Sequence, residues 1–303
     1  MRVSSTIVLA ALGSASAVVG QLSIPSSFMG LTFSAACQQA ILGVLTTGPF
    51  AECTHFADVL PALVSNISVV PVLDKFMSDV CYSAACSNAT LQQASTTILS
   101  GCASDLSGEG LPNSTVTTAF STYPLVREIL CLKTSDPYTN ASYGGVLGNP
   151  PIPISSAYNT TGGVFCVTSL LTQLSAYFGT NLTIPFVETI VKGGNSTALK
   201  LAEGIQSNII CNGCIFGALD VVEEAYPGVG SVPISKIYGL LNRTSPVNTT
   251  INGFVNGTCA YVPLNATSNG TLPTNISVSI IDSTFPYNLT NGTTTFLPNA
   301  TSV

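Results

Sequence analysis

The sequence predicts an all-α, disulfide-stapled protein, built as one helical domain or as two helical halves and followed by an extended, glycosylated C-terminal tail. Three observations lead to this prediction: apolar side chains recur at helical spacing, cysteines are numerous, and Asn-x-Ser/Thr sequons crowd the C-terminal part. The expected organisation is a signal peptide over 1–20, a helical six-cysteine half over 21–132, a Pro/Gly-rich linker over 133–160, a helical four-cysteine half over 161–262, and a glycosylated tail over 263–303 that is expected to be disordered.

Two segments show the helical period most clearly, because their apolar residues recur at three- and four-residue steps. The first comprises Leu73, Phe76, Met77, Val80 and Cys81, and the second Val167, Leu170, Leu171, Leu174, Tyr177 and Phe178. Ser34 and either Ser87 or Asn88 stand where N-caps belong, and Gly193-Gly194 follows a third apolar segment as a stop signal. Further helices are expected near 49–60, 88–105, 123–133, 207–226 and 233–242.

The ten cysteines form an even set, which indicates five disulfides in an exported protein. They are Cys37, Cys53, Cys81, Cys86, Cys102, Cys131, Cys166, Cys211, Cys214 and Cys259. If each half closes its own bridges, about 45 pairings remain open, since six cysteines allow 15 and four allow 3. Zinc binding is the weaker alternative, because the single histidine, His55, lies beside Cys53 without a second ligand pair at zinc-finger spacing.

Sixteen of the twenty asparagines lie in sequons, where random placement would give about five. These are Asn66, Asn88, Asn113, Asn140, Asn159, Asn181, Asn195, Asn242, Asn248, Asn256, Asn265, Asn269, Asn275, Asn288, Asn291 and Asn299. The excess predicts that the chain passes through the glycosylation machinery and carries N-glycans.

The N-terminus agrees with export. Arg2 precedes an apolar stretch over 7–12, and small residues follow at 15–17 and 18–20, so cleavage fits after Ala17 or, as we favour, after Gly20. The alternative, a buried first helix, explains this order of charge, apolar run and small residues less well.

Composition narrows the class of protein further. Hydrophobic residues make up 46% of the chain and charged residues 7%, against about 25% charged in ordinary soluble proteins. No apolar run after residue 20 reaches the length of a spanning helix, so we expect glycans to provide the solubility that charges usually provide. A net charge of −6 without a basic cluster argues against binding to nucleic acid or to an anionic membrane. The C-terminus has no hydrophobic anchor signal, which favours a released or wall-retained product.

The tail after residue 262 is rich in sequons and poor in large apolar side chains. Such a segment offers little packing to offset the entropy of ordering it, although the alternation over 276–280 is compatible with one short strand. A chain that ends near Leu264 is therefore expected to fold unchanged.

The search for catalytic residues gives only weak candidates. A Ser-His-Asp or Cys-His arrangement would have to use His55, and no serine lies in a Gly-x-Ser-x-Gly motif. Five acids have the right type for glycoside hydrolysis: Glu188, Glu203, Asp220, Glu223 and Glu224. The chain has no tryptophan for sugar stacking, and Glu223 and Glu224 project about 100° apart on a helix, so a solvated helix face is favoured.

The Cys211-Asn212-Gly213-Cys214 motif has the spacing of dithiol oxidoreductases, but it lacks the preceding buried strand of that fold. Two structural half-cystines with different partners are favoured. A lipid or sterol cavity is the other alternative, and its lining would come from Leu170, Leu174, Phe178, Phe186, Ile190 and Phe216. The same residues are needed for a closed core, which we expect.

Several motifs resemble a family of secreted, cysteine-rich fungal proteins of unknown function that is common in basidiomycetes. They are the runs 80–91, 100–102, 129–131, 166–168 and 211–214, within a similarity that spans roughly residues 30–260. The resemblance implies a fungal extracellular origin and a helical disulfide fold, and it implies no catalytic or binding residue.

The sequence thus predicts a secreted, N-glycosylated, disulfide-rich extracellular or cell-wall-associated protein with a structural or interaction role, without an evident catalytic site, cofactor or metal. The alternatives are a carrier of an apolar ligand and, second, a secreted dithiol oxidoreductase that uses Cys211 and Cys214. The expected partners are N-glycans and either cell-wall components or an apolar small molecule, and neither nucleic acid nor a membrane span is expected.

Overall fold

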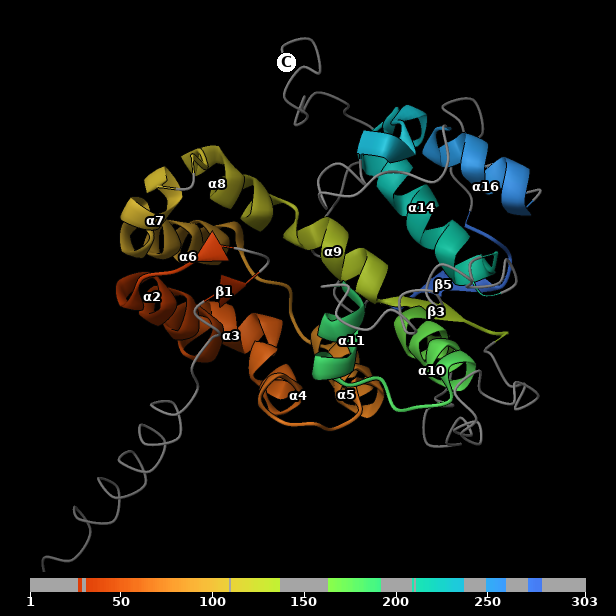
Figure 1. Ribbon diagram of the computed structural model, residues 1–303, viewed down its shortest axis with the longest axis horizontal. Helices are drawn as coiled ribbons and strands as arrows, with labels where there is room; N and C mark the ends of the chain where they lie inside the picture. The colour runs from red at the N-terminus through yellow and green to blue at the C-terminus, as the bar shows by residue number, and fades with distance from the viewer. Residues whose placement is uncertain are drawn as a thin grey trace, which may run out of the picture. The chain divides into compact units, whose positions relative to one another are not determined.

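The computed structural model describes residues 27–28, 31–108, 110–136, 163–191, 209, 211–236, 249–259 and 272–279, drawn in colour in Figure 1. The expected signal peptide, most of the expected linker and most of the expected tail lie outside these residues. The chain divides into two compact units, one formed by Met1–Ala57 and Cys86–Ser121 and the other by Asp58–Ala85 and Thr122–Val303. The units are interleaved along the chain, whereas the two halves expected from composition follow one another.

The first unit is helical apart from a short hairpin. Its elements are β1 (Ser27–Phe28), β2 (Leu31–Thr32), α2 (Ala35–Thr46), α3 (Gly48–Thr54), α6 (Asn88–Gly101), α7 (Ala103–Gly108) and α8 (Asn113–Ser121). Ser34 and Ser87 are the N-caps of α2 and α6, and their hydroxyls accept hydrogen bonds from the backbone N–H groups of Cys37 and Thr90. Both expected helix starts are confirmed.

Helices α2 and α6 pack closely because small residues face each other between them. A Cβ added at Gly101 would lie 2.3 Å from the Cβ of Ala40, so glycine is needed at this approach. The Cys37–Cys102 disulfide joins the first turn of α2 to the C-cap of α6. It lies in the core of the unit with Leu106. Asp105 accepts hydrogen bonds from the backbone N–H and the hydroxyl of Ser34, which ties α7 to the start of α2.

The second unit contains the remaining helices and a small sheet. The helices are η1 (Phe56–Val59, which begins at the boundary), α4 (Leu60–Val64), α5 (Val69–Tyr82), α9 (Tyr123–Leu130), α10 (Cys166–Phe178), α11 (Ile184–Val191), α14 (Gly213–Ala225), η3 (Val229–Ser231) and α16 (Ile251–Cys259). The strands are β3 (Leu132–Thr134), β4 (Val164–Phe165) and β5 (Ile276–Val278). The two helices expected from the strongest periodicity are α5 and α10.

The sheet corrects the expectation of an all-α fold. Strand β3 lies in the centre of the order β4-β3-β5, and both of its pairings are antiparallel, with Lys133 opposite Phe165 on one side and Ser277 on the other. Figure 1 shows β3 and β5 between α10 and α14. All three residues of β3 are buried, because helices cover this strand on both faces.

Strand β5 also corrects the expectation for the tail. Ile276 is buried with a relative exposure of 7%, and it packs in a cluster with Leu125, Leu132 and Val221. The view that everything after residue 262 is extended and unpacked is therefore wrong for 272–279. This segment is held by the pairing of Ile276, Ser277 and Val278 with β3 and by the packing of Ile276 on the apolar face of α14.

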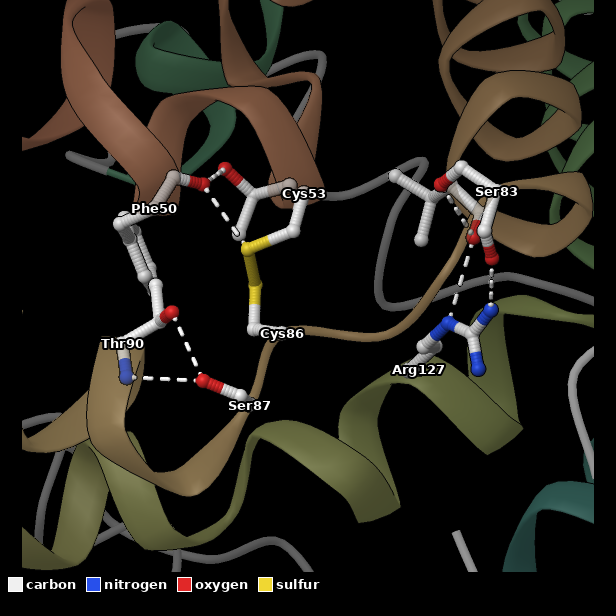
Figure 2. The surroundings of a disulfide bond; sticks show 9 residues. Phe50, Cys53, Ser83, Cys86, Ser87, Thr90 and Arg127 are labelled. Atoms are coloured by element: carbon white, nitrogen blue, oxygen red, sulfur yellow. Dashed lines mark hydrogen bonds between the residues drawn. A yellow bond between two sulfur atoms is a disulfide. The ribbon is translucent and has the colours of Figure 1, made fainter. Parts of the chain in front are cut away.

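All ten cysteines are paired in disulfides, and none is free. The pairs are Cys37–Cys102, Cys53–Cys86, Cys81–Cys131, Cys166–Cys214 and Cys211–Cys259. Figure 2 shows the Cys53–Cys86 bridge, which joins the C-terminal turn of α3 to the segment before α6. The prediction of five disulfides is confirmed, and no cysteine thiolate remains to bind zinc.

Within the described ranges, none of the helices combines the length and the apolarity that a membrane crossing requires.

Candidate functional site

The Cys-x-x-Cys motif does not form a dithiol. Cys211 is bonded to Cys259 and Cys214 to Cys166, so the two cysteines belong to different bridges. Asn212 between them is the N-cap of α14, where its side-chain oxygen accepts a hydrogen bond from the Ile215 N–H at 3.1 Å. The hypothesis of a dithiol oxidoreductase is wrong, because neither sulfur is available as an attacking thiolate.

Unit 2 buries a lysine amine in its core. The side chain of Lys133 is 1% exposed, and its Nζ lies 2.6 Å from the Tyr82 hydroxyl oxygen. The same Nζ lies 4.6 Å from the ring centroid of Phe165 and 5.2 Å from that of Tyr82. Burial of an ammonium is costly, and these two aromatic faces and the phenol oxygen replace part of its lost hydration. The antiparallel pairing of β3 with β4 places Phe165 opposite Lys133.

Tyr82 connects this amine to the molecular surface. Its ring is 40% exposed, and its oxygen accepts a second hydrogen bond, from the Ser279 hydroxyl at 3.0 Å. Burial by itself raises the pKa of Tyr82, but the hydrogen bonds from Lys133 and Ser279 and the ammonium charge outweigh it, and the pKa lies below its ordinary value. The phenol is therefore easier to ionise than that of an ordinary tyrosine.

A carboxyl group, that of Asp74, lies within the electrostatic influence of Lys133. Asp74 on α5 accepts a hydrogen bond from the Thr168 hydroxyl at 2.6 Å. Burial raises the pKa of Asp74, while the Thr168 hydrogen bond and the positive charge of Lys133 oppose that rise. The Thr168–Asp74 hydrogen bond thus links α10 to α5, and the Lys133–Tyr82 hydrogen bond links β3 to the end of α5.

Arg127 on α9 is a second buried cation with a structural role. It is 4% exposed, its Nε donates to the Val80 carbonyl at 3.2 Å, and its Nη2 donates to the Ser83 carbonyl at 2.6 Å. Figure 2 shows the guanidinium at Ser83. These carbonyls belong to the last turn and the C-cap of α5, where a cation also interacts favourably with the helix dipole.

Three of the five acids proposed for glycoside hydrolysis lie on α14, where Glu223 interacts with Asp220 and Glu224 interacts with Glu128 of α9. Burial raises the pKa of Glu223, the charge of Asp220 adds to this rise, and a hydrogen bond with Asn252 opposes it. On a different face of α14, Glu224 is exposed, and its charge adds to the effect of burial in raising the pKa of Glu128 on α9. The expectation of a solvated helix face holds for Glu224 and is wrong for Asp220, which is 3% exposed.

No sequence pattern marks Glu128 as a candidate, because its raised pKa depends on the packing of α9 against α14. A raised carboxyl pKa beside a second carboxylate is the electrostatic pattern of a glycosidase acid. At Glu223, however, the backbone of Gly230 closes over the group, because a Cβ added there would lie 1.8 Å from the Glu223 Oε1. The side chain of Glu188 and the whole of Glu203 lie outside the described residues.

Four of the six residues proposed to line an apolar cavity pack in one core cluster. Phe178 is 3% exposed, and its ring is in edge contact with those of Tyr177 and Phe186, with centroids 5.3 and 5.4 Å apart. Leu170 and Leu174 pack against the same cluster. Phe216 is half-buried outside this cluster, and the side chain of Ile190 lies outside the described residues. This packing favours the closed core.

His55 has a local backbone role. It is the half-buried C-cap of α3, with a left-handed φ of 51°, and its N–H donates to the Ala51 carbonyl. The left-handed backbone at this position explains why the helix ends at His55.

Six sequon asparagines lie on described residues. Asn66, Asn88, Asn113, Asn181 and Asn256 are exposed, and Asn275 is half-buried. The two described asparagines outside sequons are both used internally: Asn212 caps α14, and Asn252 is hydrogen-bonded to Glu223. The other ten sequons lie outside the described residues: Asn140, Asn159, Asn195, Asn242, Asn248, Asn265, Asn269, Asn288, Asn291 and Asn299.

Comparisons with models of protein families, with curated proteins and with solved structures find no match to this chain. The interpretation of its sites therefore rests on their geometry and chemistry.

Proposed function

We propose that this chain is a secreted, N-glycosylated extracellular or cell-wall-associated protein with a structural or interaction role. The observation that carries the proposal is that all ten cysteines are consumed in five disulfides. Such bridges persist in oxidising compartments and are reduced in the cytosol. Each bridge typically adds about 2–4 kcal/mol by restricting the unfolded chain, which suits a protein that works outside the cell.

The distribution of the asparagines supports the glycosylated part of the proposal. A glycan is bulky and needs a surface position, and five of the six described sequons offer one. The described asparagines without a sequon make internal hydrogen bonds instead. The motifs that resemble secreted, cysteine-rich fungal proteins agree with the same origin, which we include in the proposal.

A structural or interaction role is favoured over catalysis and over lipid carriage for two reasons. The polar groups of unit 2 serve the fold: Arg127 holds the end of α5, and Lys133 lies between the aromatic rings of Tyr82 and Phe165. The aromatic side chains considered for a cavity, Phe178 and Phe186, fill a core cluster.

The proposal is tested by producing the full chain in a eukaryotic secretion host, beside a control chain that lacks residues 2–20. We expect the full chain in the medium or the wall fraction, a loss of mass on endoglycosidase treatment, and no thiol that reacts with maleimide in the denatured, non-reduced protein. The control should stay inside the cell without glycan. Retention of the full chain in the cytosol, or two or more thiols per molecule, would refute the proposal.

The structural role is tested separately by native mass spectrometry of the secreted protein. We expect the mass of the glycosylated chain alone. A stoichiometric lipid that co-purifies with the protein and raises its melting temperature would replace this role with lipid carriage.

A further inference from the structure

The Asn275 side chain lies flat against the first turn of α14. A Cβ added at Gly213 would lie 2.7 Å from the Oδ1 and 2.8 Å from the Nδ2 of Asn275. Both amide atoms of Asn275 thus lie close to this glycine, so the nitrogen is equally close to it if oxygen and nitrogen are exchanged. Any larger residue at 213 would displace Asn275.

Ile276, the first residue of β5, packs against the same helix one turn further along. A Cβ added at Gly217, one turn after Gly213, would lie 3.0 Å from the Cγ2 of Ile276. The two glycines are four residues apart and share one face of α14, where the absence of side chains lets Asn275 and Ile276 approach closely. The Asn275 carbonyl also accepts a hydrogen bond from the Ser135 N–H at 2.9 Å, which holds the start of β5 beside β3.

Glycosylation would use the atom that this contact covers. An N-glycan replaces a hydrogen on Nδ2, and the sugar is bulky and needs solvent around it. At Asn256, an exposed residue of α16, that space is open. At Asn275, the Nδ2 lies against the backbone of Gly213, and the rest of the sequon is held in the β5 ladder.

We propose that Asn275 is a structural asparagine that stays free of glycan in the folded protein, and that glycosylation of Asn275 and packing of its amide on α14 exclude each other. This inference rests on the proposed function, since it presupposes passage through the glycosylation machinery. Asn275 is thus expected to differ in glycan occupancy from the other described sequon asparagines, although all of them lie in the same sequence motif.

The test compares two substitutions that remove a sequon without touching its asparagine. Ser277→Ala removes the Asn275 sequon and Thr258→Ala the Asn256 sequon, and both replaced side chains are exposed. The intact mass of the secreted protein should fall by one glycan for Thr258→Ala and stay unchanged, apart from the substituted oxygen, for Ser277→Ala. Glycopeptide mapping of the unsubstituted protein should find Asn275 bare. A stoichiometric glycan at Asn275 in the folded, secreted protein would overturn the inference.

A third variant tests the exclusion in the opposite direction. Gly213→Ala places a methyl group where the Asn275 amide lies, so the amide should turn away from α14 and the secreted variant should gain a glycan at Asn275. Gly43→Ala is the matched control, because a Cβ at that helical glycine meets nothing within 4 Å, and it should leave the glycan pattern unchanged. Secreted Gly213→Ala protein that remains bare at Asn275 would count against the exclusion.

The inference and the proposed function fail in different ways. If no sequon of the secreted chain carries a glycan, the glycosylated part of the proposed function fails. Asn275→Ala and Asn256→Ala then decide the inference in the glycan-free protein: a fall in melting temperature for Asn275→Ala alone supports the structural role, and equal melting temperatures overturn it.

Discussion

The docking of β5 can be measured with one substitution, Ile276→Ala. Ile276 is 7% exposed and packs against Gly217 and Val221 of α14. Loss of a buried isoleucine side chain costs about 2–5 kcal/mol, depending on how far the site collapses. Because β5 is a short edge strand that can move toward α14, we expect the lower part of this range, about 2–3 kcal/mol. For a domain of this size that corresponds to a fall in melting temperature of about 4–12 °C.

The matched control is Val278→Ala in the same strand. Val278 is 37% exposed, so this substitution should change the unfolding free energy by less than about 0.5 kcal/mol. Circular dichroism at 222 nm would follow thermal unfolding of both variants with their disulfides intact. A chain that ends near Leu264 should lose at least as much stability as Ile276→Ala. Equal melting temperatures for Ile276→Ala, Val278→Ala and the unsubstituted protein would refute the docking of β5.

Three further predictions concern the polar core, the acids and the bridges. Arg127→Met should lower the unfolding free energy by about 2–4 kcal/mol in urea, since it leaves two carbonyls at the end of α5 without their charged donor, and an unchanged midpoint would contradict this role. Burial raises the pKa values of Asp74, Glu128 and Glu223 above their ordinary values of 3.8, 4.5 and 4.5, so their stabilisation is present below those values and is lost as the pH rises through the raised ones. The melting temperature should therefore rise as the pH falls from neutral toward those ordinary values, and Glu128→Gln should reduce that rise, whereas a fall over this range would contradict the assignment. Thiol labelling of the denatured, non-reduced protein should find no free cysteine, and a stoichiometric signal at Cys211 would contradict the pairing.

The features that the sequence predicts correctly have local causes. Ser34 and Ser87 cap helices because a hydroxyl reaches the backbone N–H three residues ahead, which requires no knowledge of the rest of the fold. A period of 3.6 residues over more than three turns likewise predicts the helix α10, although it does not predict that polar residues such as Thr172 and Ser175 are buried as well. An even number of cysteines in a chain with export signals likewise indicates disulfides, although their pairing depends on the three-dimensional structure.

The sheet could not be predicted because each of its strands is too short to show a pattern. Strands β3 and β5 have three residues and β4 has two, which is below the length at which a period of two can be recognised. Lys133 and Thr134 follow the helix α9 and precede a segment rich in proline and glycine. The composition of this region therefore predicts that they belong to a linker. Only the alternation of apolar and polar residues over 276–280 predicts a strand, and nothing in that segment identifies β3 as its partner.

The buried cations also bear on how this protein stays in solution. Of the four basic residues that the structure describes, Lys75 and Lys236 are exposed, while Arg127 and Lys133 are buried. In a chain with eight basic residues, these two hold α5 and β3 in place and add no charge to the surface. The surface is therefore poorer in charge than the composition suggests, and the need for another solubilising group is greater. Exposed sequon asparagines at Asn88 and Asn113, each in the first turn of a helix, offer positions where a glycan can supply that hydration without disturbing the core.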